Sequence, residues 1–193
     1  MKDDFKKQVD TQNACSVTNK NEFVRTRFVI EEEDLNKIPG TQITFKVVKT
    51  INSLCLFDGE PFYVVDERKI YSALSDQYQP SYERKELAYA SVFKSLILNH
   101  GFASGNKRTA VIVLYLFSKM IGNDIKLSDE ELADLAYRIE SGRDSGLSIE
   151  EIADRVFSHH ESSCEVAKLS NIEELAKDLI RKHEWLMFEL GKK

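Results

Sequence analysis

The sequence predicts an all-α protein, and three observations carry that prediction. Apolar residues recur at spacings of three and four along most of the chain, three later helices begin with capping boxes, and the run with the composition of a strand or hairpin arm, residues 62–65, is short. The chain has 193 residues, 42% of them apolar, with 8 Gly and 3 Pro, so it can bury a core. A Pro-Gly turn at Pro39 and Gly40 predicts the end of a polar N-terminal extension over residues 1–40.

The first half of the chain is predicted to form three helices and the short extended run. Residues 41–57 carry the first helical stripe, at Ile43, Val47, Ile51 and Leu54. A turn at Asp58 and Gly59 follows, and the aromatic and β-branched run 62–65 comes after it. Helices are then predicted over residues 67–77 and 81–100, and the second is apolar on most of its faces, as expected of a buried helix.

The second half of the chain is predicted to be helical throughout. A central helix, apolar almost all round, begins at about Thr109 and ends at Gly122. Three further helices start at capping boxes, in which a Ser accepts from a backbone N–H and a Glu three residues later accepts in return: Ser128 with Glu131, Ser148 with Glu151, and Ser170 with Glu173. The last of them carries one long apolar stripe from Ile172 to Leu190.

Composition excludes several classes of function. The 27 Lys and Arg against 32 Asp and Glu give a formal net charge of −5, whereas a nucleic-acid-binding domain usually carries a basic excess. Three cysteines without a CxxC pair predict neither a disulfide framework nor a thiolate zinc site. The longest apolar run, residues 110–117, is far shorter than the roughly 20 residues of a membrane span. We therefore expect a cytoplasmic protein with neither a nucleic-acid nor a membrane partner.

The densest polar constellation is His100-Gly-Phe-Ala-Ser-Gly-Asn-Lys-Arg108, between two strongly apolar helices. A Gly-containing turn that runs into a helix start presents backbone N–H groups and the positive end of the helix dipole to an anion, and Lys107 and Arg108 add positive charge there. His100 is the candidate general base, and Asn106 can orient a phosphate. The alternatives are a capped structural histidine and a solvated loop.

The segment HGFASGNKRTA resembles the signature of the Fic/Doc superfamily, HxFx(D/E)(A/G)N(G/K)R, and its ending resembles the death-on-curing (Doc) branch. The resemblance spans about residues 41–160 and implies an all-α Fido helical bundle with a short β-hairpin flap at Phe62, Tyr63 and Val64 that docks the target. Residues 1–40 and a C-terminal helical extension, 161–193, lie outside it.

The resemblance also implies an activity. Fido proteins move part of ATP or another nucleoside triphosphate, with Mg²⁺, to a hydroxyl of a target protein; the Fic branch transfers AMP, and Doc transfers the γ-phosphate to a threonine of elongation factor Tu. By the same resemblance His100 is the catalytic base and Phe102 a core anchor, and the phosphate-binding residues are Ser104, Gly105, Asn106, Lys107 and Arg108. Lys107 and Val111 match Doc, so we expect phosphoryl transfer rather than AMP transfer, with an external antitoxin as a further partner.

Ser104 departs from the family pattern, because it stands where the Asp or Glu ligand of Mg²⁺ is expected. Three explanations are open. A carboxylate elsewhere, at Asp58, Glu60 or Asp66, supplies the metal ligand; the chemistry is slower or different; or the protein binds a nucleotide or partner without catalysis.

Overall fold

The computed structural model describes residues 43–192 except 79–80, 83, 143–145 and 159–170, so the predicted extension over 1–40 lies outside the described residues. In chain order the described elements are α2 (Phe45–Cys55), α3 (Glu67–Ser75), the 3₁₀ turn η1 (Asp76–Tyr78), α4 (Lys85–Asn99), α5 (Asn106–Ile121), α6 (Asp129–Glu140), α7 (Ile149–Val156), α8 (Ile172–Lys182) and α9 (Glu184–Leu190). This part of the chain contains no sheet, and its β-type pairings are two isolated antiparallel bridges. The predicted all-α class is confirmed.

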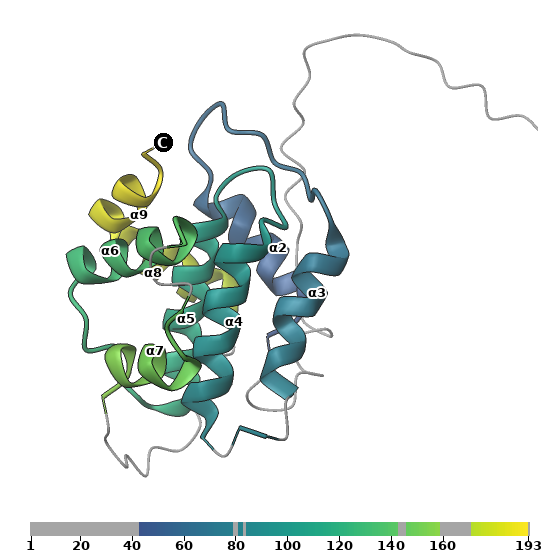
Figure 1. The fold of residues 1–193 in the computed structure, drawn as a ribbon. Helices are drawn as coiled ribbons and strands as arrows, with labels where there is room; N and C mark the ends of the chain where they lie inside the picture. Colours follow the sequence, from purple (N-terminus) through teal and green to yellow (C-terminus); the bar gives the residue numbers. More distant parts are fainter. Residues whose placement is uncertain (1–42, 79–80, 83, 143–145, 159–170, 193) are drawn as a thin grey trace, which may run out of the picture.

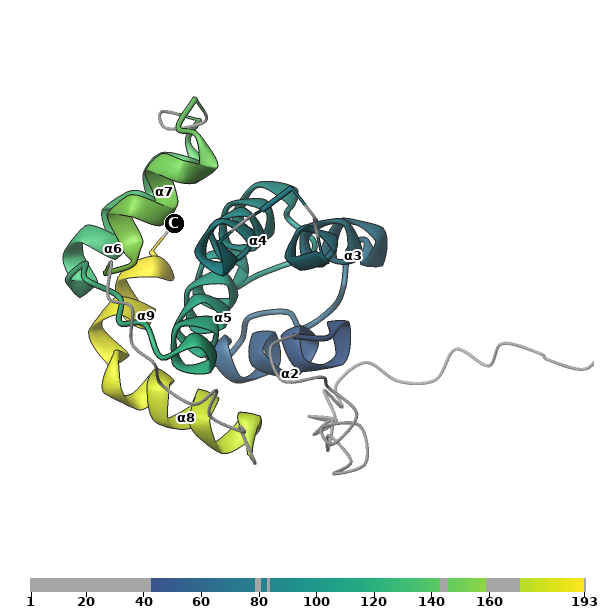
Figure 2. The same ribbon diagram turned by 90° about the horizontal axis from the view of Figure 1, so that it is seen from below.

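Helices α4 and α5 form the centre of the bundle and lie side by side (Figures 1 and 2). Helices α2 and α3 flank them on one side, α6 and α7 on the other, and α8 packs against both α5 and α2. Every residue from Arg108 to Ser118 of α5 is buried, as the all-round apolar pattern predicts. Buried residues of α8 and α9 belong to the same core, so the C-terminal helices complete the bundle. No described helix has the length and apolarity needed to cross a membrane.

Two of the three predicted capping boxes are confirmed. Ser128 and Ser148 each accept from the N–H of the Glu three residues later, and both reciprocal bonds are present. The third prediction is wrong: the N-cap of α8 is Asn171, which accepts from the N–H of Glu174 at 3.0 Å, while Ser170 lies outside the described residues. Asn is an equally good N-cap, so sequence alone could not choose between the neighbours.

The single C-terminal helix predicted through residue 190 is also wrong, because the chain breaks at His183 between α8 and α9. This residue has φ −111° and ψ 37°, and its ring Nδ1 lies 2.7 Å from Asp129 at the start of α6. A tertiary contact therefore overrides an apolar stripe that is compatible with one straight helix.

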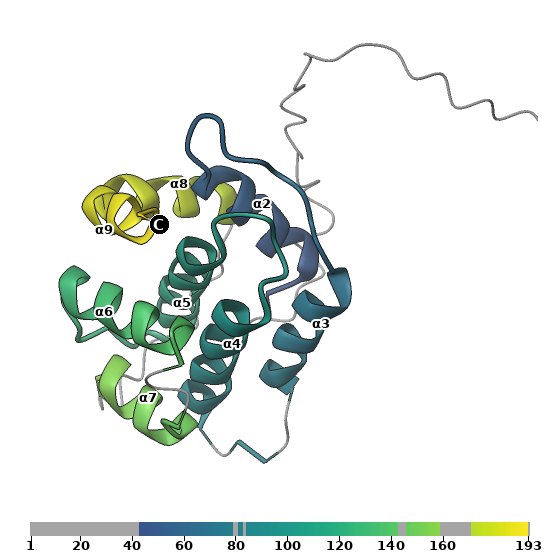
Figure 3. The ribbon, with the colours of Figure 1, turned by 45° about the horizontal axis from the view of Figure 1, so that its top comes forward.

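Two connections meet at one end of the bundle and build the site (Figures 1 and 3). One is the α2–α3 connection, residues 56–66, and the other is the α4–α5 loop, residues 100–105. They pair where Val64 bridges Phe102, with the N–H of Ala103 donating to Tyr63 O at 3.1 Å and that of Val65 donating to Gly101 O at 2.8 Å. The predicted extended run thus pairs with the loop through one bridge, and the described residues form no hairpin there.

Candidate functional site

His100 ends α4 in the left-handed region, with φ 46° and ψ 54°, and its side chain is exposed. In the described part of the chain its imidazole has no hydrogen bond or ion pair. The next residue, Gly101, passes so close to α3 that a Cβ there would lie 2.4 Å from Ile70 Cγ1. Phe102 then turns into the core and is buried, as the resemblance implies for the core anchor.

Helix α5 begins at Asn106, three residues earlier than the predicted start at about Thr109. The physical cause is the Asn106 side chain, which folds back on the loop: its Oδ1 accepts from the N–H of Phe102 at 3.0 Å and its Nδ2 donates to Phe102 O at 2.8 Å. These two bonds close the turn. The amide predicted to orient a phosphate is therefore engaged with the backbone of its own loop.

Gly105 is the N-cap of α5 and has φ 76°, a conformation that other residues adopt only with strain. A Cβ at this position would also lie 3.1 Å from Asn52 Nδ2 and 3.1 Å from Leu56 Cδ2. As a glycine it has no side chain to cap the first-turn N–H groups of α5. The role of Gly105 in an anion-binding helix start stays a prediction.

Sequence reasoning missed Asn52, a buried residue of α2. Its Nδ2 donates to Ser104 O at 2.9 Å and to Thr109 Oγ1 at 3.0 Å, so it ties the loop to the first turns of α5. Its Oδ1 is buried without a hydrogen-bond partner among the described residues. The available signal was a polar residue directly beside the apolar stripe of the first predicted helix.

Arg108 is the most deeply buried cation of the site, with a side chain only 2% exposed. Its Nη1 donates to Cys55 O at 2.6 Å, and its Nη2 lies 2.6 and 2.7 Å from the two carboxylate oxygens of Glu60. The Phe57 ring covers one face of the guanidinium, with its centroid 4.4 Å from Cζ. Arg108 is thus held by the end of α2 and by the α2–α3 connection.

Glu60 accepts hydrogen bonds from several donors of the site. Besides Arg108, it accepts from the N–H of Phe57 at 2.7 Å and from Ser104 Oγ at 2.8 Å. Burial alone raises the pKa of Glu60, but the hydrogen bonds from Arg108, Phe57 and Ser104 outweigh burial, and the net pKa is lowered. Glu60 is therefore an ionised carboxylate near neutral pH, and it is the anion paired with Arg108.

Of the three carboxylates considered as substitutes for the missing acidic ligand, Glu60 is the one hydrogen-bonded to Ser104. Asp66 is instead the N-cap of α3, where it accepts from the N–H of Arg68 and pairs with the Arg68 guanidinium. Asp58 is exposed in the same connection as Glu60.

Lys107 pairs with a different carboxylate. Its Nζ lies 2.6 Å from Glu140 Oε2 on α6 and 4.9 Å from the centroid of the Tyr137 ring. The predicted cation pair of the loop is therefore divided between two carboxylates, Glu60 for Arg108 and Glu140 for Lys107.

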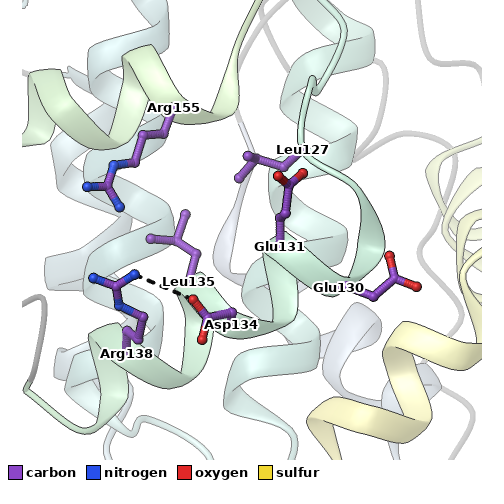
Figure 4. Close-up of a pocket in the computed structure, with 7 residues that line it drawn as sticks. All are labelled: Leu127, Glu130, Glu131, Asp134, Leu135, Arg138 and Arg155. Atoms are coloured by element: carbon purple, nitrogen blue, oxygen red, sulfur yellow. Dashed lines mark ion pairs between the residues drawn. The ribbon is translucent and has the colours of Figure 1, made fainter.

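The residues of the predicted flap lie beside this site. Val64 pairs with Phe102, Phe62 is half-buried, and Tyr63 is exposed, as is the neighbouring Val65. A cavity of about 380 Å³ lies elsewhere, between α6 and α7, and none of the predicted site residues lines it (Figure 4). Its lining residues are Leu127, Glu130, Glu131, Asp134, Leu135, Arg138 and Arg155.

The sequence matches no family model, no curated protein and no solved structure.

Proposed function

We propose that this protein transfers the γ-phosphoryl group of a nucleoside triphosphate, such as ATP, to a hydroxyl of a target protein in the cytoplasm. The proposal rests on the resemblance of residues 100–110 to the Doc signature. The observation that carries it is the position of His100. Its exposed imidazole, without a partner in the described chain, sits at the end of α4, where the loop leads directly to the N-terminus of α5.

The proposed step is an in-line displacement with His100 as general base. The target hydroxyl oxygen forms a bond to the γ-phosphorus, and its proton passes to a ring nitrogen of His100. The bond between the γ-phosphorus and the β,γ-bridging oxygen breaks, and the nucleoside diphosphate leaves with that electron pair. An imidazole suits this role because its ordinary pKa lies close to neutrality.

Phosphate binding in this proposal requires an exchange of partners at Arg108. Its guanidinium and the Ser104 hydroxyl are hydrogen-bonded to Glu60, so phosphate oxygens take the place of the Glu60 carboxylate oxygens. The first turn of α5 adds backbone N–H groups that its glycine N-cap leaves uncapped by a side chain. The exposed side chains of Tyr63 and Val65 offer an edge on which the target docks.

Mg²⁺ would supply charge neutralisation to the transferred phosphates. The residues around Ser104 do not fit a protein-held Mg²⁺ in this arrangement, because both oxygens of Glu60 already face the Arg108 guanidinium. The described residues also contain no group of three or more His, Cys, Asp or Glu side chains arranged to hold a metal ion. No step above therefore uses a metal.

The test is transfer of label from ATP, labelled in parallel at the α- or the γ-phosphate, to proteins of a bacterial lysate and to purified elongation factor Tu. The variants are His100→Ala and, as a matched control on the same helix end, Leu98→Ala, whose side chain is exposed. We expect γ-label that Leu98→Ala retains and His100→Ala loses. Label from the α-position would replace the proposal with AMP transfer.

A second candidate is a nucleotide- or partner-binding module without catalysis, and Ser104 favours it because a neutral hydroxyl stands where the acidic Mg²⁺ ligand is expected. Calorimetric titration with ATP, read together with the label-transfer assay, separates the candidates. A binding module binds ATP equally well in wild type and His100→Ala and transfers no label in either. Under both candidate functions, an antitoxin would be a separate protein that binds this one.

A further inference from the structure

The last helix, α9, contacts the site from outside the segment that carries the family resemblance. Its C-terminal end lies at the same end of the bundle as the α2–α3 connection (Figures 1 and 3). There it meets two aromatic residues, Phe57 and Tyr137, and each of these rings covers one cation of the site.

The first contact runs through Phe57 to Arg108. The Phe188 ring of α9 lies 6.5 Å from the Phe57 ring, centroid to centroid, and Phe57 in turn covers the Arg108 guanidinium at 4.4 Å. Gly191, just after α9, also lies close to Phe57, because a Cβ there would fall 2.5 Å from Phe57 Cε2. The position of the Phe57 ring is therefore set by the end of α9.

The second contact runs through Tyr137 to Lys107. The Tyr137 hydroxyl donates to the backbone at the end of α9, where Glu189 O lies at 2.5 Å and Lys192 O at 3.2 Å. The same ring lies under Lys107 Nζ, with its centroid 4.9 Å away. Lys107 and Arg108 thus each have an aromatic ring on one side, and both rings contact residues 188–192.

We propose that the end of α9 is a positioning element for the site: through Phe57 and Tyr137 it keeps Arg108 and Lys107 covered and paired with Glu60 and Glu140. The contacts of α9 with Phe57 and Tyr137 do not depend on a bound nucleotide. Their use in phosphate binding rests on the proposed function. When the end of α9 moves away, the guanidinium of Arg108 loses its cover and becomes accessible to an anion or a reagent.

The test measures how fast phenylglyoxal, an arginine-directed reagent, modifies Arg108 in the full chain, with each site quantified by mass spectrometry. Phe188→Ala removes the ring that contacts Phe57, and since Phe188 is 59% exposed the substitution leaves the core intact. Trp185→Ala is the matched control, because Trp185 is an exposed aromatic on the same helix, 47% exposed, with no ring contact to Phe57. Phe188→Tyr keeps the ring.

We expect Phe188→Ala to speed Arg108 modification on the order of fivefold, the size of effect that loss of one aromatic contact gives. Phe188→Tyr and Trp185→Ala should modify like wild type, and Gly191→Ala, which displaces the Phe57 ring, should behave like Phe188→Ala. Unchanged reactivity in Phe188→Ala, or an equal increase in Trp185→Ala, would overturn the proposal. Arg84, which is already 42% exposed, serves as the internal reference in every sample.

The acetylation rate of Lys107 provides a second test of the same proposal. Tyr137→Phe removes the hydroxyl that bonds to the end of α9 and keeps the ring under Lys107. We expect faster acetylation of Lys107 by an amine-reactive reagent, while Lys119, an exposed lysine of the same helix, stays unchanged. Neither measurement uses a nucleotide. An absence of phosphoryl transfer in wild type would therefore refute the proposed function without affecting the test of the role of α9.

Discussion

Arg108 and Glu60 form a close ion pair across the site, with Nη2 2.6 Å from Oε1, although 48 residues separate them in the chain. The guanidinium is almost completely buried, and the carboxylate also accepts from Ser104 and from the backbone of Phe57. A buried guanidinium needs such a partner, because an unpaired buried charge is costly. The pair therefore avoids an unpaired buried charge, and in the proposed function the Glu60 carboxylate stands where phosphate oxygens would bind.

Replacing Glu60 with Gln should separate these two effects. The variant leaves the Arg108 charge uncompensated, so we expect the free energy of unfolding to fall by about 1–3 kcal/mol. Pyrophosphate or ATP should then stabilise the variant more than the wild type, because the vacated donors accept the added anion. Urea unfolding with and without pyrophosphate measures both effects, and Glu67→Gln, at an exposed residue of α3, is the control. Equal stabilisation of Glu60→Gln and wild type by pyrophosphate would contradict the exchange of partners.

The lowered pKa of Glu60 gives the pair a defined pH dependence. A carboxylate whose pKa is lower in the folded than in the unfolded state contributes stability above its unfolded pKa, and that contribution is lost as the pH falls through the folded pKa. The ordinary value is 4.5, so the stability difference between wild type and Glu60→Gln should be constant near neutral pH and shrink below about pH 4.5. Urea unfolding of both proteins between pH 7 and pH 3 checks this. A difference that grows on acidification would show the opposite linkage.

The helices could be predicted from the sequence because their signals are local. Apolar spacing located α2 and α5, and two Ser-to-Glu capping boxes located α6 and α7. The break at His183 could not be predicted, since it depends on Asp129, which lies 54 residues away. The local pattern of α8 and α9 alone is compatible with one helix.

The candidate site was predicted only in part, for the same reason. The motif identified the loop residues from His100 to Arg108, but their partners, Asn52, Glu60 and Glu140, lie on other elements. The expectation of an anion cradle assumed free side chains. Long-range pairing engages Lys107 and Arg108 within the chain, and no spacing rule in one sequence reports such contacts; Asn106 is engaged locally, by the backbone of Phe102.

Asn106 should prove to be a structural residue of the loop. Asn106→Ala removes both hydrogen bonds to the backbone of Phe102, so we expect a loss of about 1–3 kcal/mol in the free energy of unfolding. Asn106→Asp keeps the acceptor for the Phe102 N–H and loses the donor, and it should fall between wild type and Asn106→Ala. Chemical denaturation of the three proteins measures the order. If Asn106→Ala is as stable as the wild type, the two bonds do not hold the loop.

Gly105 and Gly142 form a matched pair for testing how tightly the loop is packed. Their φ angles are 76° and 75°, but a Cβ at Gly142 would meet nothing within 4 Å, whereas one at Gly105 would lie 3.1 Å from Asn52 Nδ2. Gly142→Ala should cost about 1–2 kcal/mol through left-handed strain alone. Gly105→Ala should cost more, because Asn52 must also move from Ser104 and Thr109. Thermal or urea unfolding gives both values, and equal losses would show that the loop gives way without cost.

Ser104→Asp tests whether the missing carboxylate limits metal binding. The Ser104 hydroxyl lies 2.8 Å from Glu60 Oε1, so the new carboxylate would stand beside an existing one, and Arg108 can neutralise only one of them. A pair of hard, negatively charged oxygens is what Mg²⁺ prefers. We expect Mn²⁺, used as a spectroscopic probe for Mg²⁺, to bind Ser104→Asp about tenfold more tightly than wild type, and Mg²⁺-dependent transfer to increase with it. Ser104→Asn, of equal size and no charge, is the control. Unchanged Mn²⁺ affinity and unchanged transfer in Ser104→Asp would show that this position does not limit the reaction, and would leave the Glu60–Arg108 exchange as the step that governs phosphate binding.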